Sequence, residues 1–516
     1  MIFALIVVPV LGLFFGVHRY LWCRLVRDTT TPHSRPRRAG TAAAFALPLT
    51  ALAALLAGRV GAPFPLQQAL AWPGFLWLAL VLYLTLALLV GEAVRAAGLR
   101  VLRDHEPDAG TSSNAGVSPD VEAPPDAGAP PDARTPPDAG APPDAEAPSS
   151  AGTSPSAVTL PGSGMLPESG APPTAVPAPA PSSDPPGRPS SDPPGGPPAD
   201  PPGGPPADPP GAPSSDLPRT PSPSSAPTLL PPGTPALPPL AVPPRRLFLA
   251  RAVAAGATLA ATAAVGYGTV TTLRGPAVKR VTIPLAKLPR AAHGFRIAVV
   301  SDIHLGPILG RAHTRRVVEA INRTNPDLVA IVGDLVDGSV ANLAPAAEPL
   351  RGLHSRFGAY FVTGNHEYYS GAAPWVDHIR ELGIRPLENA RTELPGFDLA
   401  GVNDIAGQTE QAGPDYDLAL SGRDPSRAVV LMAHQPVTIH DTVRFGVDLQ
   451  LSGHTHGGQM WPFTYIAAAT NPTVAGLERY GDTQLYVTRG AGAWGPPVRV
   501  GAPPDVTVVE LASLRA

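Results

Sequence analysis

Long apolar runs dominate the first hundred residues of the chain. Nearly unbroken hydrophobic stretches cover Ile2 to Trp22, Thr41 to Ala57 and Gly74 to Val90, and an alanine-rich stretch covers Leu247 to Val265. A helix of about 20 apolar residues is long enough to cross a bilayer. The pattern predicts about three transmembrane helices in residues 1–103 and a fourth in residues 245–270. The runs at Thr41 to Ala57 and Leu247 to Val265 are both rich in alanine, and for these two a buried or interfacial helix is the alternative.

Basic residues near these runs predict their orientation. Five arginines separate the first two spans, whereas Arg59 alone lies between the second and third. Lysine and arginine accumulate in cytoplasmic loops, so alternation of four spans places residues 271–516 outside the cytoplasm. Arg245-Arg246-Leu-Phe248-Leu249 resembles a twin-arginine export signal and favours the same side. We expect a multi-pass cell-membrane protein with an extracytoplasmic domain, and a cytoplasmic domain is the alternative.

Residues 104–244 differ from both flanking regions in composition. They hold 44 of the 70 prolines and almost no aromatic or long aliphatic side chains. Proline removes backbone donors and blocks helices and strand pairing, and a segment without apolar residues cannot build a core. The composition predicts a disordered linker rich in Pro, Gly, Ala and Asp.

Short apolar runs alternate with helical patterns in residues 271–516. Strands predicted at Arg296 to Ser301 and Leu328 to Val332 flank an amphipathic helix at Thr314 to Arg323, which forms a βαβ unit with a parallel sheet. Leu343 to Leu353 and Pro374 to Leu382 are predicted as further helices. Later strands are assigned to a second sheet: Asp398 to Val402, Val429 to Met432, Leu485 to Thr488 and Val506 to Glu510. Periodicity alone predicts an α/β fold.

Clusters of metal-binding residue types lie at the ends of apolar runs. They are Asp302-Ile-His304, Gly333-Asp334-Leu-Val-Asp337, Gly364-Asn365-His366-Glu367, His434 and Gly453-His454-Thr-His456. A polar residue at the end of a buried strand is costly without a partner, and a shared ligand explains several at once.

The residue types restrict the ligand. Carboxylate, amide and imidazole donors favour a divalent ion such as Mn²⁺, Zn²⁺ or Fe²⁺, while the lone Cys23 excludes a thiolate zinc site. A net charge of −3, without a basic patch interleaved with aromatics, argues against a nucleic-acid partner.

The order D-x-H, G-D-x-x-D, G-N-H-E, H and G-H-x-H resembles the calcineurin-like metallophosphoesterase superfamily over roughly residues 290–512. The longer forms around Asp302, Asp334 and His454 are similar to its bacterial YkuE-like branch. The resemblance implies a double β-sheet sandwich flanked by helices and a centre of two divalent metal ions. One ion would take Asp302, His304, Asp334 and His456, and the other Asp334, Asn365, His434 and His454.

The resemblance also implies roles and an activity. The two ions would share a water whose hydroxide attacks phosphorus, and His366 would stabilise the phosphoryl oxygens or protonate the leaving oxygen. Asp337 and Glu367 are expected to hydrogen-bond the ligands, and Arg489 is a candidate contact for the substrate phosphate. The expected function is membrane-anchored hydrolysis of a phosphodiester, phosphomonoester or pyrophosphate, with a lipid-linked substrate as one candidate. The alternatives are a phosphodiesterase for soluble nucleotides and a non-catalytic membrane scaffold.

Overall fold

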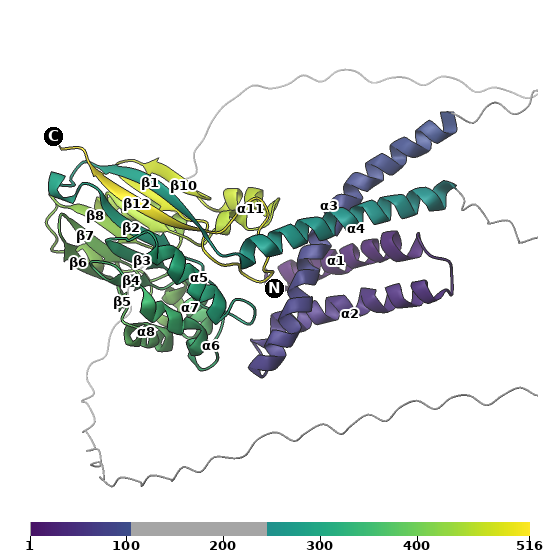
Figure 1. Cartoon of the computed structure of the whole chain (residues 1–516), viewed down its shortest axis with the longest axis horizontal. Helices are drawn as coiled ribbons and strands as arrows, with labels where there is room; N and C mark the ends of the chain where they lie inside the picture. The colour runs from purple at the N-terminus through teal and green to yellow at the C-terminus, as the bar shows by residue number, and fades with distance from the viewer. Residues whose placement is uncertain (1, 105–244, 516) are drawn as a thin grey trace, which may run out of the picture. The chain divides into compact units, whose positions relative to one another are not determined.

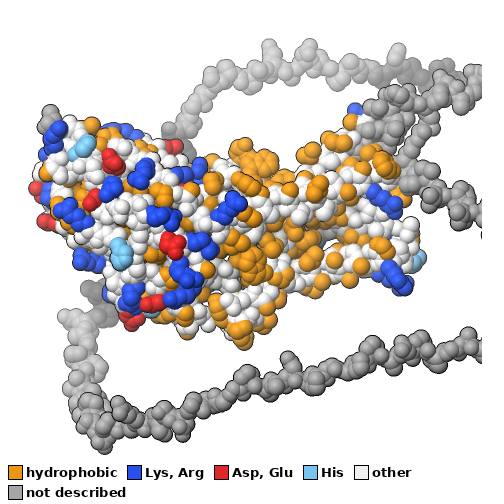
Figure 2. All heavy atoms as spheres, in the orientation of Figure 1, with side chains coloured by type: hydrophobic (Ala, Val, Ile, Leu, Met, Phe, Trp, Pro, Cys, Tyr) orange, Lys and Arg blue, Asp and Glu red, His pale blue; other side chains and the backbone are white. Residues whose placement is uncertain are grey.

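In the computed structural model, which describes residues 2–104 and 245–515, helices occupy every predicted span. They are α1 (Ile2–Leu21), α2 (Arg35–Ala57), α3 (Phe64–Asp104) and α4 (Arg245–Leu273). By length and composition, the searched part of these residues contains 3 helices able to cross a membrane, at Arg35–Ala57, Phe64–Val94 and Arg246–Leu273. Figure 2 shows that mostly hydrophobic side chains cover these helices, whereas charged side chains dot the sheet domain.

One helix is longer than the prediction. The hydrophobic run ends near Val90, but α3 continues to Asp104 because the following residues contain no proline and, apart from Gly91 and Gly98, are mostly good helix formers. The predicted linker at 104–244 lies almost wholly outside the described residues, and the domain boundaries around it stay predictions.

Two six-stranded sheets form the domain that follows α4 (Figure 1). The first has the order β1-β12-β2-β3-β4-β5 and the second β10-β11-β9-β8-β7-β6. The strands of the first sheet are β1 (Ala277–Leu285), β12 (Asp505–Ser513), β2 (Phe295–Val300), β3 (Leu328–Val332), β4 (Ala359–Val362) and β5 (Arg385–Pro386). Those of the second are β10 (Gly476–Tyr480), β11 (Thr483–Val487), β9 (Leu449–Ser452), β8 (Ala428–Met432), β7 (Phe397–Gly401) and β6 (Ala390–Leu394).

The two faces of the first sheet enter different cores. Successive side chains of a strand point to opposite faces, so Ile297, Val299 and Leu328 join a core that includes Leu399 and Val430 of the second sheet. Ala298 and Val300 instead pack with the helices on the outer face. These helices are α5 (Arg311–Asn322), α6 (Val340–Ala347) and α8 (Ala372–Glu381). The expected sandwich flanked by helices is therefore confirmed.

The sheet assigned to Val506 to Glu510 was predicted wrongly. This segment is in β12, which pairs in parallel with β1 and antiparallel with β2, so it belongs to the first sheet. Both partner strands are distant in sequence, and β1 itself was not predicted because Lys279, Arg280 and Pro284 weaken its strand pattern. Because β1 was not predicted, the sequence did not indicate that a strand would insert between β1 and β2, which is where β12 lies.

The remaining short elements lie in the connections. They are α7 (Asn365–Ser370), α9 (Tyr416–Leu420), α10 (Ile439–Thr442), α11 (Phe463–Thr470) and several short 3₁₀ turns. Of these, α7 and α11 border the candidate site, because α7 begins at Asn365 and α11 follows the loop of His454 and His456.

Candidate metal centre

The predicted ligands lie at the carboxyl ends of strands from both sheets. Asp302 and His304 follow β2, and Asp334 follows β3. From the second sheet, His434 follows β8, and the G-H-x-H loop follows β9. Since β2 is parallel to β3, and β8 to β9, the chain ends of each pair meet at one edge.

The backbone is strained at these positions. Asp302, His304, Asp334, His454 and His456 all have positive φ, between 48° and 72°. Non-glycine residues rarely adopt this left-handed region, and each such residue costs on the order of 1 kcal/mol or more. The sharp turns point successive side chains toward one centre. Strain of this kind concentrated in one set of residues is typical of a functional site.

A first group consists of Asp302, His304 and His456, which could hold a metal ion. The Nε2 atoms of the two histidines lie 3.0 Å apart, and His456 Nε2 lies 3.3 Å from Asp302 Oδ1. His454 N donates to both carboxylate oxygens of Asp302 at 3.1 Å. These bonds fix the Asp302 carboxylate against the histidine pair.

A second group consists of Asp334, His434 and His454. His434 Nε2 lies 3.1 Å from Asp334 Oδ2, and Asn365 Oδ1 lies 3.0 Å from His454 Nδ1. Asp334 Oδ2 is also 3.9 Å from His304 Nε2, in the first group. The structure therefore brings all seven predicted ligands together, with Asp334 between the two groups.

Glycines allow this close approach. A Cβ atom built on Gly364 would overlap Asp334 Oδ1, and one on Gly453 would overlap Ser301 Oγ and Asp302 Oδ2. Close packing explains these glycines, because any larger residue would displace a predicted ligand. Their place directly before Asn365 and His454 explains the G-N-H and G-H-x-H spacing.

Burial and neighbouring charges strongly shift the pKa values of the histidines in the site. Burial lowers the pKa of His304, but the Asp337, Asp334 and Asp302 charges outweigh it and raise the pKa to about 9. Burial also opposes protonation of His434, yet Asp334 raises its pKa well above the usual value. Burial and the charge of His434 lower the pKa of His454 to about 4. The carboxylates thus create a strong preference for positive charge at the centre.

The donor set fits bound cations. His434 Nδ1 is 2.8 Å from the Val332 carbonyl oxygen, which requires the ring proton on Nδ1. Its Nε2 is buried without a hydrogen-bond partner and faces a carboxylate. His304 Nδ1 is likewise held by Asp337 Oδ1 at 2.9 Å, so its Nε2 lone pair faces His456 Nε2. A cation at the second group would satisfy the unpartnered His434 Nε2, and a cation at the first group would take the two facing histidine nitrogens as ligands once they are deprotonated.

Asp337 connects the metal centre to His366. Its Oδ1 atom accepts from His304 Nδ1 at 2.9 Å and lies 2.6 Å from His366 Nδ1. Burial raises the pKa of Asp337, but the two histidines outweigh it and bring the pKa to about 2. Asp337 therefore stays ionised and orients both rings. This leaves His366 Nε2 as the ring nitrogen available to a substrate.

Glu367 fixes the loops that carry two predicted ligands. Its carboxylate accepts from Asp334 N at 3.0 Å, Leu335 N at 2.7 Å and Gly364 N at 2.6 Å. Burial and the Asp334 charge raise its pKa to about 7. The three backbone donors tie the turn after β3 to the start of α7.

The raised pKa of His304 predicts a pH-dependent metal affinity. A proton on Nε2 must leave before a cation binds, so binding releases protons below about pH 9. Between about pH 6 and pH 8, apparent Mn²⁺ affinity should rise at least about tenfold per unit, measured by calorimetric titration of the full chain. Asp337→Asn removes the largest upward influence on His304 and should shift this dependence to lower pH. Equal affinity at all pH values would contradict this interpretation of the site.

Sequence reasoning missed Arg499. This arginine is fully buried and donates to the carbonyl oxygens of His456 and Arg489, each at 2.8 Å. Its Nη2 lies 3.1 Å from His456 Nδ1, so it holds the last predicted ligand in place. It follows no strand and belongs to no motif, and only the tertiary fold brings it to the site. Arg489, the candidate phosphate contact, packs beside Gly457, next to His456.

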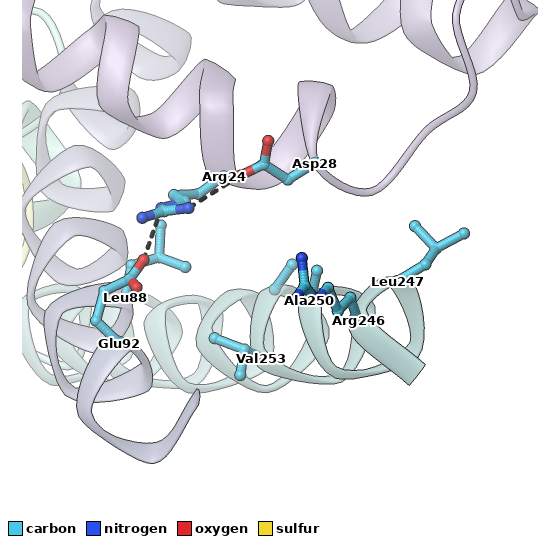
Figure 3. A pocket seen from close by; sticks show the side chains of 9 residues that line it. Arg24, Asp28, Leu88, Glu92, Arg246, Leu247, Ala250 and Val253 are labelled. Atoms are coloured by element: carbon cyan, nitrogen blue, oxygen red, sulfur yellow. Dashed lines mark hydrogen bonds and ion pairs between the residues drawn. The ribbon is translucent and has the colours of Figure 1, made fainter. Parts of the chain in front are cut away.

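A separate cavity lies among the helices. Its volume is about 490 Å³, and Figure 3 shows its lining of Arg24, Asp28, Leu88, Glu92 and residues at the start of α4. Arg24 is paired with Asp28 at 3.0 Å and with Glu92 at 2.6 Å. None of the predicted metal ligands lines this cavity, so it is distinct from the metal centre.

Comparisons with known proteins find a family and several relatives that match the domain carrying this site. The family model described as "Calcineurin-like phosphoesterase" matches residues 295–458. The chain is 39% identical over 259 residues to "Transmembrane protein with metallophosphoesterase domain" from Danio rerio, covering 48% of this chain and 59% of the relative. It is 36% identical to an uncharacterized metallophosphoesterase from Helicobacter pylori, covering 52% of this chain and 73% of the relative. The metallophosphoesterase YkuE from Bacillus subtilis is 31% identical, over 52% of this chain and 98% of YkuE.

Proposed function

Because this chain belongs to the calcineurin-like metallophosphoesterases, we propose that it is a membrane-anchored, metal-dependent hydrolase of phosphate esters. The observation that carries the proposal is the convergence of Asp302, His304, Asp334, Asn365, His434, His454 and His456 in two adjoining groups. A non-catalytic scaffold would have no need of this complete, strained set of donors.

The proposed division of ligands follows the geometry. Asp302, His304 and His456 would hold one cation, Asn365, His434 and His454 the other, and Asp334 would serve both. Two such cations supply charge stabilisation for the phosphoryl group and lower the pKa of a water toward neutrality. Mn²⁺, Zn²⁺ and Fe²⁺ all suit oxygen and imidazole donors.

His366 is the proposed proton donor. Asp337 holds its Nδ1, which fixes the ring and leaves Nε2 for the leaving oxygen. His366→Gln should lower kcat by roughly 10²-fold while leaving the metal content unchanged, because His366 is not in either proposed ligand set. His354→Gln, a change at an exposed histidine outside both groups, is the matched control and should have no effect. Loss of metal in His366→Gln would contradict the assignment.

The bond that is cleaved can be tested with a substrate panel. Full chain in detergent with Mn²⁺ should hydrolyse at least one of four substrates: bis-p-nitrophenyl phosphate, p-nitrophenyl phosphate, a lipid pyrophosphate and a soluble nucleotide diester. Activity that survives saturating EDTA would overturn the metal mechanism. Preference for the lipid pyrophosphate would support a lipid-linked substrate, which the apolar helices favour. Preference for a soluble nucleotide diester would support the alternative function.

We further propose that the catalytic domain faces the extracytoplasmic side. The arginine-rich loop between α1 and α2 supports this orientation through the bias of basic residues toward the cytoplasm. A reporter fused after Ala516 tests it. Activity of a reporter that functions only in the cytoplasm would contradict the orientation.

A further inference from the structure

An uncharged and exposed segment follows the metal-site loop. Residues 461–477 contain no Asp, Glu, Lys or Arg, and α11 within them has no buried residue. Trp461 is 48% exposed, Tyr465 70% and Ile466 58%. A helix on the surface of a soluble domain normally turns its apolar side chains inward and shows charged ones to water. The surface formed by α11 and Trp461 therefore lacks a partner within the described residues.

Backbone contacts join this surface to the end of α4. Arg499 N donates to Gly268 O of α4 at 3.1 Å, and Trp461 N donates to Val500 O at 2.9 Å. Met460, directly before Trp461, belongs to the same apolar cluster as residues of α3 and α4. Gly268 lies in the last two turns of α4, where the chain leaves a candidate span for the charged sheet domain. If α4 crosses the bilayer, α11 begins at the level of the bilayer surface.

The side chains suit that level. Tryptophan and tyrosine are enriched where hydrocarbon meets water, because their rings are apolar and their polar atoms stay hydrated. Trp461, Tyr465 and Trp494 are all exposed, and Phe463 adds an apolar ring that is 40% exposed. An interfacial segment of this kind typically sinks about 5–10 Å into the boundary of headgroups and acyl chains.

We propose that α11 and Trp461 form a second contact of this protein with the lipid bilayer, in addition to its membrane-spanning helices. The partner is the phospholipid surface of the same membrane. Gln459, two residues before Trp461, donates to Trp494 O at 2.9 Å and accepts from Trp494 N at 3.0 Å, and the Trp494 ring lies 5.8 Å from that of His366. The contact would therefore place this side of the candidate site near the lipid headgroups. The contact itself does not depend on the proposed hydrolysis.

The test uses a single fluorescent label in the full chain. Cys23, the one cysteine, is replaced by serine, and Ile466→Cys is labelled with an environment-sensitive dye. Asp377→Cys on α8 is the matched control, because that side chain is 73% exposed. Both proteins are reconstituted in phosphatidylcholine–phosphatidylglycerol nanodiscs. The fluorescence of each dye is measured with two quenchers in separate experiments. One is a lipid with a spin label near the head of its acyl chain, and the other is iodide in the water.

The proposal predicts opposite behaviour at the two positions. At Ile466→Cys, the lipid spin label should quench at least about twofold more than at the control, and iodide correspondingly less. The same pattern at both positions, with iodide quenching each label, would overturn the proposal. Shielding of the Ile466→Cys label from both quenchers would also overturn it and would indicate a protein partner, such as a second copy. Since Ile466 is exposed, its replacement leaves the core intact.

Discussion

Asp334→Asn should abolish hydrolysis, with kcat/KM falling on the order of 10³-fold or more. The Asp334 carboxylate lies near histidines of both groups, at 3.1 Å from His434 Nε2 and 3.9 Å from His304 Nε2. Although burial opposes it, the charges of His434 and the other histidines lower the pKa of Asp334, so it is ionised and its charge is available to cations. Asparagine keeps the shape and an acceptor for His366 N but removes that charge. The decrease is measured with bis-p-nitrophenyl phosphate under saturating Mn²⁺.

The control for this variant is Asp377→Asn, which changes an exposed carboxylate paired with Arg380. It should retain full activity. Thermal unfolding of both proteins distinguishes lost catalysis from lost folding. Activity of Asp334→Asn within about tenfold of the unmodified chain would rule out a shared carboxylate at the centre.

Glu367→Ala should produce the largest loss of stability among the site residues. It leaves the buried N–H groups of Asp334, Leu335 and Gly364 without their acceptor. Each unsatisfied buried donor costs about 1–3 kcal/mol, so the total loss is on the order of 4 kcal/mol. For a domain of this size that corresponds to a decrease in Tm of roughly 10 °C. Circular dichroism of the full chain in detergent measures it.

Glu393→Ala is the matched control because its carboxylate is 71% exposed and pairs with Arg391 at 3.3 Å. Its effect on Tm should be close to zero. If Glu367→Ala is no less stable than this control, the three hydrogen bonds do not hold the loops as described.

The fold class and part of the candidate site could be predicted from the sequence. Asp302 and Asp334 directly follow apolar strand patterns, and the ends of parallel strands share one edge, so local pattern and topology agree. The left-handed turns that aim these side chains could not be predicted, because aspartate and histidine adopt this conformation more often than other non-glycine residues but still only in a minority of cases. Arg499 could not be found either, because its partners are backbone carbonyls set by tertiary packing.

The errors have a common physical cause. The sheet of β12 is determined by β1 and β2, which lie more than 200 residues earlier, and strand pattern carries no information about such partners. The surface of α11 went unnoticed because a short run such as Phe463 to Ala469 indicates a core element as readily as an exposed one. Burial separates the two readings, and burial is a property of the folded chain.

The metal content of the purified full chain tests the central claim most directly. After loading with Mn²⁺ and removal of free ions, elemental analysis should find about two ions per chain, as a dinuclear centre requires. Asp334→Asn should lose most of this metal, while Asp377→Asn should keep it. Less than about one ion per chain, or full metal loading of Asp334→Asn, would contradict the claim that these side chains bind two cations and share Asp334 between them.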